Sequence, residues 1–441
     1  MTCEISKLGL ADALTNNELV YHYQPQVDLL TGLADLMSRT DSPVKEPMLP
    51  EERRAALGLA AIFALRMLGL FIVLPVFAVA ARNLTGGQDV AAIGLALGAY
   101  GLTQACLQLP FGILADHWGR KPVIACGLVL FLAGSIVCAM ADSVSSMTIG
   151  RMLQGSGAIS AAITALVADL TRDSQRSKAM AMIGGSIALM FALSLAVAPV
   201  IYGWVGLSGI FWVTCALGLG AFWALFRLVP PAPTLPGVVP GTFRQVLLEP
   251  RLIRLNLGVF ILHAIQIAMW VAVPALLIQL AGLPLQNHWM IYVPAVVASF
   301  FVLWPAMMQA ERHKRMAQVF AFAVVLIGVV QMGFVALFDA GIDSQFIATA
   351  AILLLIAIFF TGFNILEALQ PSLISRIAPP TGKARALGVY NTLQSLGLFS
   401  GGALGGWLLQ TGGYVAVFSG CGVLALIWFV ILLKWPARVP A

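Results

Sequence analysis

Long apolar segments alternate with short polar segments along most of this chain. About 20 consecutive apolar residues are enough to carry a helix across a bilayer, and by that measure the sequence predicts twelve membrane-spanning helices. They lie near residues 56–81, 90–111, 123–141, 146–169, 179–204, 208–228, 253–281, 287–308, 316–338, 345–372, 384–410 and 412–434. The pattern therefore predicts an all-α membrane protein.

The spans fall into two groups of six, separated by a polar, proline-rich stretch. We expect an N-terminal extension at 1–47, a six-helix bundle at 48–229, a linker at 230–252 and a second six-helix bundle at 253–441. Two bundles joined in this way are typical of a secondary transporter in which one half rocks against the other around a central cavity.

Composition agrees with a lipid environment and excludes several other classes. Hydrophobic residues make up 60% of the chain and charged residues only 10%, too few to cover a water-soluble surface. The net charge of +6 is spread over short loops, so a nucleic-acid partner is not expected. The six cysteines show no metal-ligand spacing, and we predict neither a metal site nor a cofactor.

Basic residues gather in every second loop, as at 120–121, 172–178, 312–315 and 376–385. The intervening loops carry acids and turn formers, with Arg82 as the exception. Loops rich in lysine and arginine face the cytoplasm. This pattern predicts a multi-pass protein of a bacterial-type cytoplasmic (inner) membrane with both termini in the cytoplasm.

Charged groups within apolar spans are costly and need a reason. Glu367, in the tenth span, is the first choice for proton binding, because burial penalises the ionised form of a carboxyl group. The alternative is a helix-end glutamate that reaches Arg376 or water. His263, in the seventh span, titrates near neutral pH in its unperturbed state. The preferred interpretation is that His263 is packed and hydrogen-bonded. The alternative is that it forms a coupled pair with Glu367 that shares protons.

Arg66 in the first span is permanently charged and cannot carry the proton. It meets substrate or braces neighbouring helices; hydrogen bonding to backbone carbonyls is the preferred alternative. Other polar residues in the spans either line a substrate cavity or bond one helix to another: Tyr100, Gln104, Gln108, Asn364, Tyr390 and Gln394. Gly397, Gly401 and Gly405 recur every four residues in the eleventh span, a spacing that predicts close helix packing.

Several motifs resemble those of the major facilitator superfamily. The segment Gly112–Pro122, reading GILADHWGRKP, matches the signature loop of that family almost throughout, and 149–157 resembles a second motif typical of proton-driven members. Residues 198–203 resemble the antiporter motif, although Ala198 replaces its usual glycine. The runs 65–69 and 74–75 are most similar to the YajR-type branch of drug/proton antiporter relatives. The resemblance implies the major facilitator fold, with twelve transmembrane helices in two six-helix bundles.

The same resemblance assigns roles to the loop and to Arg151. It implies a conformational latch in which Asp116 lies near the start of the eleventh span and Arg120 pairs with Asp169. The latch residues are Gly112, Asp116, Gly119, Arg120, Lys121 and Asp169. It also implies that Arg151, in the fourth span, influences protonation or binding from the cavity wall; hydrogen bonding to backbone carbonyls is the alternative.

Residues 10–32 are different, because 19–29 resembles the opening strand of EAL-type cyclic-di-GMP phosphodiesterases. The Glu-Ala-Leu signature that should follow is missing, so no metal site can be assembled from it. We expect a loosely attached, non-functional extension.

Together these features predict a secondary transporter rather than an enzyme. We expect alternating access and proton-coupled efflux of small amphipathic or drug-like molecules by a monomer. A proton-coupled nutrient symporter is the alternative within the same class. A cyclic-di-GMP signalling protein built on the EAL-like segment is the alternative from another class.

Overall fold

The computed structural model describes residues 47–230, 243–313, 315–342, 344–379 and 382–433. Within these ranges the regular structure is helical, with one isolated bridge between Thr85 and Ser143. The EAL-like segment at 10–32 lies outside the described residues.

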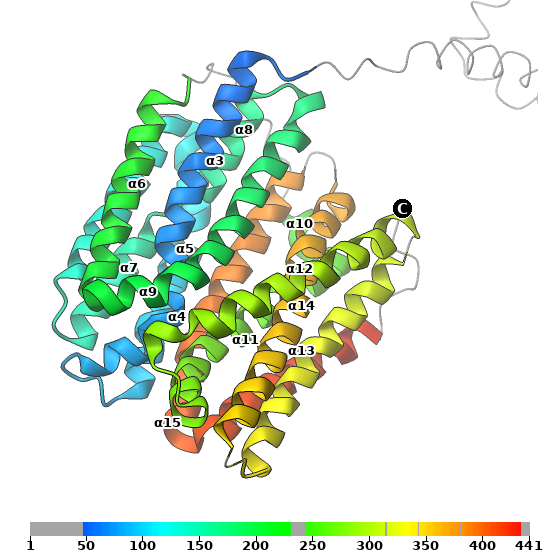
Figure 1. Cartoon of the computed structure of the whole chain (residues 1–441). Coiled ribbons are helices and arrows are strands. Elements are labelled where there is room, and N and C mark those ends of the chain that lie inside the picture. Colours follow the sequence, from blue (N-terminus) through cyan, green and yellow to red (C-terminus); the bar gives the residue numbers. More distant parts are fainter. Residues whose placement is uncertain (1–46, 231–242, 314, 343, 380–381, 434–441) are drawn as a thin grey trace, which may run out of the picture. The chain divides into compact units, whose positions relative to one another are not determined.

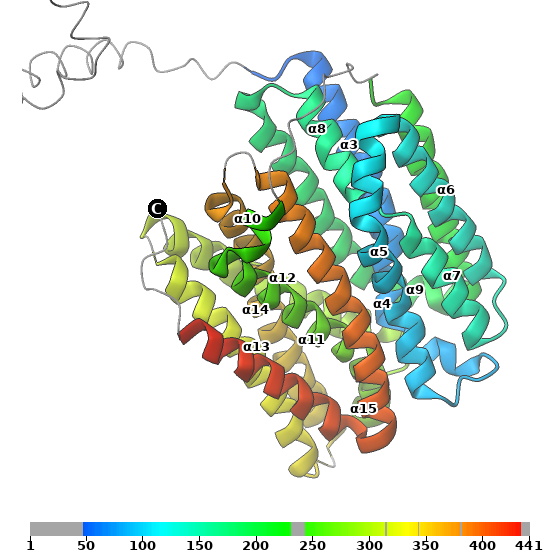
Figure 2. The same ribbon diagram turned by 180° about the vertical axis from the view of Figure 1, so that it is seen from behind.

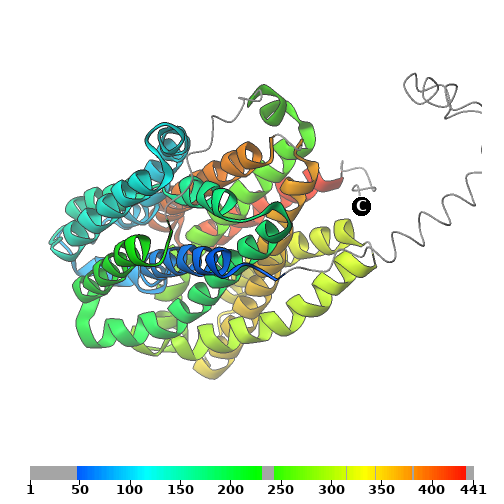
Figure 3. The ribbon, with the colours of Figure 1, turned by 90° about the horizontal axis from the view of Figure 1, so that it is seen from above.

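The first half of the chain contributes α3 to α9, which Figure 1 colours from blue to green. They are α3 (Pro50–Phe71), α4 (Leu74–Ala80), η2 (Ala81–Asn83), α5 (Val90–Trp118), α6 (Arg120–Ala139), α7 (Val144–Ser156), α8 (Ser160–Leu170) and α9 (Asp173–Arg227). The second half contributes α10 (Phe243–Leu248), α11 (Pro250–Ala281), η3 (Leu285–Asn287), α12 (Trp289–Arg312), α13 (Met316–Asp339), α14 (Gln345–Ile377) and α15 (Lys383–Leu433). Seen from above, the cyan helices of the first half lie on one side and the yellow α13 lies on the other (Figure 3).

Ten helical segments in the described residues are long and apolar enough to cross a membrane. Two of them include α9, of 55 residues, and α15, of 51 residues, which are each long enough to cross twice. α9 breaks at Gly206, with φ of 65°, and α15 breaks at Gly413, with φ of 66°. Positive φ suits glycine, which has no Cβ. The predicted fifth and sixth spans are thus the two parts of α9, and the eleventh and twelfth are those of α15.

The predicted polar loop at 112–122 is mostly helical. α5 continues to Trp118 and α6 begins at Arg120, so the chain reverses at Gly119 alone, with φ of 93°. The apolar pattern placed the helix end at residue 111 because hydropathy detects the part of a helix that is in lipid. It does not detect the turns that extend beyond it.

α15 packs along both α5 and α11 (Figure 2). Gly397, Gly401 and Gly405 face α11, and a Cβ at Gly401 would lie 2.2 Å from the Ala264 carbonyl oxygen. Gly402 and Gly406 face α5, and a Cβ at Gly402 would lie 2.5 Å from the Gly94 carbonyl oxygen. Glycine removes the side chains that would hold the backbones apart. The predicted close approach is therefore present on two faces of one helix.

The two halves approach most closely at the helix ends near Asp89. The Ala91 amide donates to Gln410 Oε1 at 2.7 Å, and a Cβ at Gly203 would lie 3.1 Å from the Gln286 side chain. Toward Gly119 the spacing relaxes, because a Cβ at Gly388 would meet only Leu109, at 3.9 Å. We call these the Asp89 end and the Gly119 end.

Gly401→Ala should destabilise the protein by about 1–3 kcal/mol, because the new methyl group would overlap backbone that cannot move without separating α15 from α11. Gly184→Ala in α9 is the matched control, since a Cβ there meets no atom within 4 Å. Thermal unfolding in detergent measures both. Equal melting temperatures for the two variants would contradict tight backbone packing at Gly401.

Candidate functional site

Glu367 and His263 lie side by side within the second half. Glu367 Oε1 of α14 is 3.3 Å from His263 Nε2 of α11, and Gln394 Nε2 of α15 is 2.8 Å from the same nitrogen. His263 is 4% exposed, whereas a third of the Glu367 side chain (33%) is exposed. Three helices thus bring together three of the residues that were singled out from sequence.

The hydrogen-bond geometry fixes how protons can be held in this group. His263 Nδ1 lies 3.0 Å from the Val259 carbonyl oxygen, which can only accept, so Nδ1 carries a hydrogen. In a neutral imidazole Nε2 is then an acceptor, and it would face an ionised Glu367 oxygen that also only accepts. A proton on Glu367 turns this contact into a hydrogen bond, whereas a proton on Nε2 does so only if the Gln394 amide turns its oxygen toward the ring. The pair can therefore hold one exchangeable proton between two helices.

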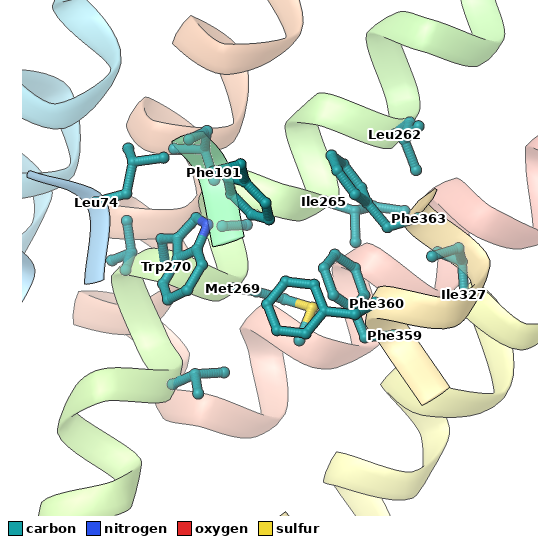
Figure 4. Packing of buried hydrophobic residues seen from close by; sticks show 14 of the residues in the cluster. Leu74, Phe191, Leu262, Ile265, Met269, Trp270, Ile327, Phe359, Phe360 and Phe363 are labelled. Carbon is teal, nitrogen blue, oxygen red and sulfur yellow. The ribbon is translucent and has the colours of Figure 1, made fainter. Parts of the chain in front are cut away.

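A cluster of aromatic rings adjoins the pair. Figure 4 shows its members Phe191, Phe360 and Phe363, of which Phe191 belongs to the first half. Phe363, one helical turn before Glu367, contacts the His263 ring at 5.8 Å between centroids. Phe191 of α9 lies 6.1 Å from Phe363 and 5.9 Å from Phe360. Phe191 also contacts Phe71 of its own half at 5.2 Å. The two halves therefore meet through aromatic side chains beside the His263–Glu367 pair.

The first half holds two buried arginines on either side of one tyrosine. Arg66 Nη2 donates to the Tyr100 hydroxyl at 2.9 Å and to the Gly157 carbonyl at 2.8 Å. Arg151 lies over the Tyr100 ring at 5.1 Å and donates to Gln154 Oε1 at 2.9 Å. Both arginines are 1% exposed. The backbone hydrogen bond that was the preferred alternative for Arg66 is present, together with the contact to Tyr100.

The remaining cavity candidates differ in how fully they are paired. Asn364 Nδ2 donates to Ser299 Oγ of α12 at 2.9 Å, and the Tyr390 hydroxyl donates to Gln370 Oε1 of α14 at 3.3 Å. Both side chains therefore bond one helix to another. Gln104 and Gln108, in contrast, are buried with amide atoms that have no partner among the described residues.

The latch residues form a compact ion-pair group at the Gly119 end. Arg120 Nε lies 3.2 Å from Asp169 Oδ2, and both side chains are 16% exposed. Asp116 pairs with the same arginine and is 59% exposed, while Lys121 donates to the Val229 carbonyl. A Cβ at Gly112 would meet only Ala161, at 3.6 Å. All these contacts lie within the first half.

The sequence did not reveal the residues that contribute to the site through packing or through hydrogen bonds to other helices. Phe191 and Phe360 resemble ordinary apolar span residues, and Ser299 and Gln370 become relevant only through partners on other helices. One signal was available in the sequence: Phe359, Phe360 and Phe363 line one side of the tenth span just before Glu367.

The chain has two halves, discontinuous membrane spans and buried ionisable groups between helices. This architecture is that of a multi-pass membrane transporter. The sequence matches the Major Facilitator Superfamily over residues 59–365 and 255–441. The chain belongs to this family, whose members are transporters and not enzymes.

Within the family the chain belongs to the YajR-type branch. It is 42% identical to the inner membrane transport protein YajR of Escherichia coli (strain K12) over 389 residues, which cover 87% of this chain and 84% of that protein. It is 27% identical to the multidrug resistance protein MdtH of Proteus mirabilis (strain HI4320), over 78% of this chain and 84% of that protein. The chain is accordingly a multi-pass transporter of the inner membrane.

A solved structure of a D-xylose-proton symporter shares the fold. Its TM-score is 0.67 at 16% identity, with 87% of this chain and 98% of that chain covered. This confirms the predicted all-α fold with two six-helix bundles. The resemblance of residues 10–32 to an EAL domain is not borne out: the family match covers residues 59–365 and 255–441 and does not include this segment.

The pairing of Arg120 with Asp169 predicts an energetic coupling between them. In a double-mutant cycle of Arg120→Gln and Asp169→Asn, the low exposure of both side chains (16%) should give a coupling of about 0.5–2 kcal/mol. Thermal unfolding of the two single variants and the double variant measures it. Asp142→Asn, in the loop between α6 and α7, should instead be additive with Arg120→Gln. A coupling of zero for the first pair would show that the contact contributes nothing.

Proposed function

We propose that the protein exports small amphipathic molecules by alternating access, in exchange for protons that bind at the His263–Glu367 pair. The observation that carries this proposal is the contact between an imidazole and a carboxyl group of two different helices, beside the aromatic residues that join the halves. Intramembrane ionisable groups that face one another are the usual components of proton relays.

The basic loops support an orientation in which the Gly119 end faces the cytoplasm. In that orientation the closely packed Asp89 end faces the periplasm and separates the central residues from it. Asp116 and Arg120 then belong to the less closely packed, cytoplasmic side, where Asp116 is exposed and contacts its own half. Engagement of this loop with the start of α15 belongs to the opposite conformation in the proposed cycle.

Protonation changes the charge of the His263–Glu367 pair. A protonated pair is neutral at Glu367 and keeps a hydrogen bond to His263, whereas a deprotonated pair leaves an uncompensated charge in a region of low dielectric constant. The protonated pair therefore favours a conformation in which it is buried, and the deprotonated pair favours one in which it is hydrated. One proton moving down a membrane potential of 100 mV supplies about 2.3 kcal/mol, which is available to drive the opposing movement of substrate.

The buried aromatic cluster between the halves suits amphipathic substrates once the helices around it move apart in the proposed cycle. Phe191, Phe360 and Phe363 offer apolar, aromatic contact area, and only a few polar groups accompany them. Such surfaces accept compounds of varied shape. The name of the MdtH relative, a multidrug resistance protein, supports the direction of export.

Glu367→Gln should abolish proton-driven transport, because an amide cannot change its charge. We expect a drop of at least tenfold in flux driven by a pH gradient, with substrate counterflow at equal pH kept within about threefold, since a permanently neutral site still permits exchange. The assay uses proteoliposomes that contain a pH-sensitive dye. A panel of ethidium, rhodamine 6G and 2-naphthoate supplies the transported probe.

Glu311→Gln, at the Gly119 end of α12, is the control and should transport as the wild type does. Full proton-driven transport by Glu367→Gln would remove the role of this residue. Probe accumulation on the side toward which protons flow would replace antiport by symport.

A further inference from the structure

The two buried arginines of the first half have no counter-ion among the residues that the structure describes. No carboxylate of the described residues lies within 4.0 Å of Arg66 or Arg151, because the ion pairs found there involve other groups. Arg66 Nε, Arg66 Nη1 and Arg151 Nε have no hydrogen-bond partner among the described residues, and these atoms are fully buried. A buried charge without a partner is strongly unfavourable, so this region is incomplete as it stands.

The unpaired groups gather around one helix face. Tyr100, Gln104 and Gln108 recur every four residues on α5 and so lie on one side of it. Tyr100 contacts both guanidinium groups, and the two glutamines add further buried amide atoms without partners among the described residues. A ligand that binds along this face would meet donors from several side chains.

The break in the fourth span adds a second source of positive potential. Helix α7 ends at Ser156 and α8 begins at Ser160, so the Gly157 carbonyl that Arg66 binds lies within the interruption. The start of α8, which has 11 residues, presents backbone N–H groups and the positive end of the helix dipole. Interrupted spans with exposed helix starts are typical of sites that receive anionic substrate groups.

We propose that Arg66 and Arg151 bind the carboxylate of an organic anion, so that the transported molecules include amphipathic carboxylates. Arginine suits this ligand because its planar guanidinium offers parallel donors to both carboxylate oxygens. The rings of Tyr100 and of Phe131, which lies 5.9 Å from the Arg66 guanidinium, supply aromatic surface for the rest of the molecule. This inference rests on the proposed function and specifies its substrate class.

The donor atoms are buried in the present conformation, so the ligand reaches them only when the surrounding helices move. A ligand that prefers such a conformation shifts the population toward it. Equilibrium binding therefore reports the site without any need to impose a pH gradient.

The test compares 2-naphthoate with 2-naphthamide, which has nearly the same shape without the charge. Isothermal titration calorimetry on the full-length protein in detergent should show at least tenfold tighter binding of the naphthoate. Arg66→Gln and Arg151→Gln should each reduce the ratio of the two affinities, naphthoate over naphthamide, to about twofold or less. Arg66→Lys keeps the charge and should retain part of the preference for naphthoate.

Arg54→Gln is the matched control, because Arg54 is exposed and donates to the Arg227 carbonyl at the Gly119 end; it should keep the full preference. Tyr100→Phe keeps both charges and should keep the preference within about threefold. Thermal unfolding identifies any variant that does not fold. If one of the two arginine variants fails to fold, the affinity ratio of the other variant decides the test.

Equal binding of the two compounds by the wild type would overturn the proposal, as would a preference that survives both glutamine variants or a wild type that binds neither compound. Failure of the proton-coupling proposal is distinguishable from these results. Glu367→Gln belongs to the other half and should leave the naphthoate preference intact even if it transports normally.

Discussion

Backbone contact between glycines is the constraint on which the arrangement of the two halves depends. Lipid removes the hydrophobic force between helices, so their association relies on close van der Waals packing and a few polar contacts. α15 satisfies this requirement twice, toward α11 through Gly397, Gly401 and Gly405 and toward α5 through Gly402 and Gly406. The first contact is internal to one half and the second joins the halves. One helix therefore holds the second half together and connects it to the first.

The position of these glycines also decides at which end of the molecule α5 and α15 are closely packed. The close approach of α5 includes Gly94, Gly98 and Gly101, whereas Gly112, further along the same helix, meets only a residue of its own half. Toward the Gly119 end, a Cβ at Gly388 of α15 would meet only Leu109 of α5, at 3.9 Å. Separation of α5 from α15 at the Asp89 end would require the loss of many short contacts together. In the proposed alternating-access cycle this favours two discrete arrangements over a continuous range.

Much of this architecture could be predicted from sequence, because the length of an apolar run and the spacing of glycines are local properties. The helices of span length and the packing role of Gly401 are of this kind. Partners across helices are not, since Glu367 meets His263 and Asn364 meets Ser299 only after the chain has folded. The helical continuation of α5 to Trp118 was also missed, because hydropathy describes the lipid-facing part of a helix and not its full length.

The energies involved show that the aromatic contacts cannot drive a conformational change unaided. Phe363 contacts both His263 and Phe191, so the proposed proton site and the boundary between the halves share one residue. An aromatic pair contributes about 0.5–1.5 kcal/mol beyond its burial, whereas reversing a population from 1:99 to 99:1 requires about 5.5 kcal/mol. One proton crossing a potential of 100 mV supplies about 2.3 kcal/mol. In the proposed cycle, proton binding, the aromatic contact and ligand charge therefore have to act together, because none of them is sufficient alone.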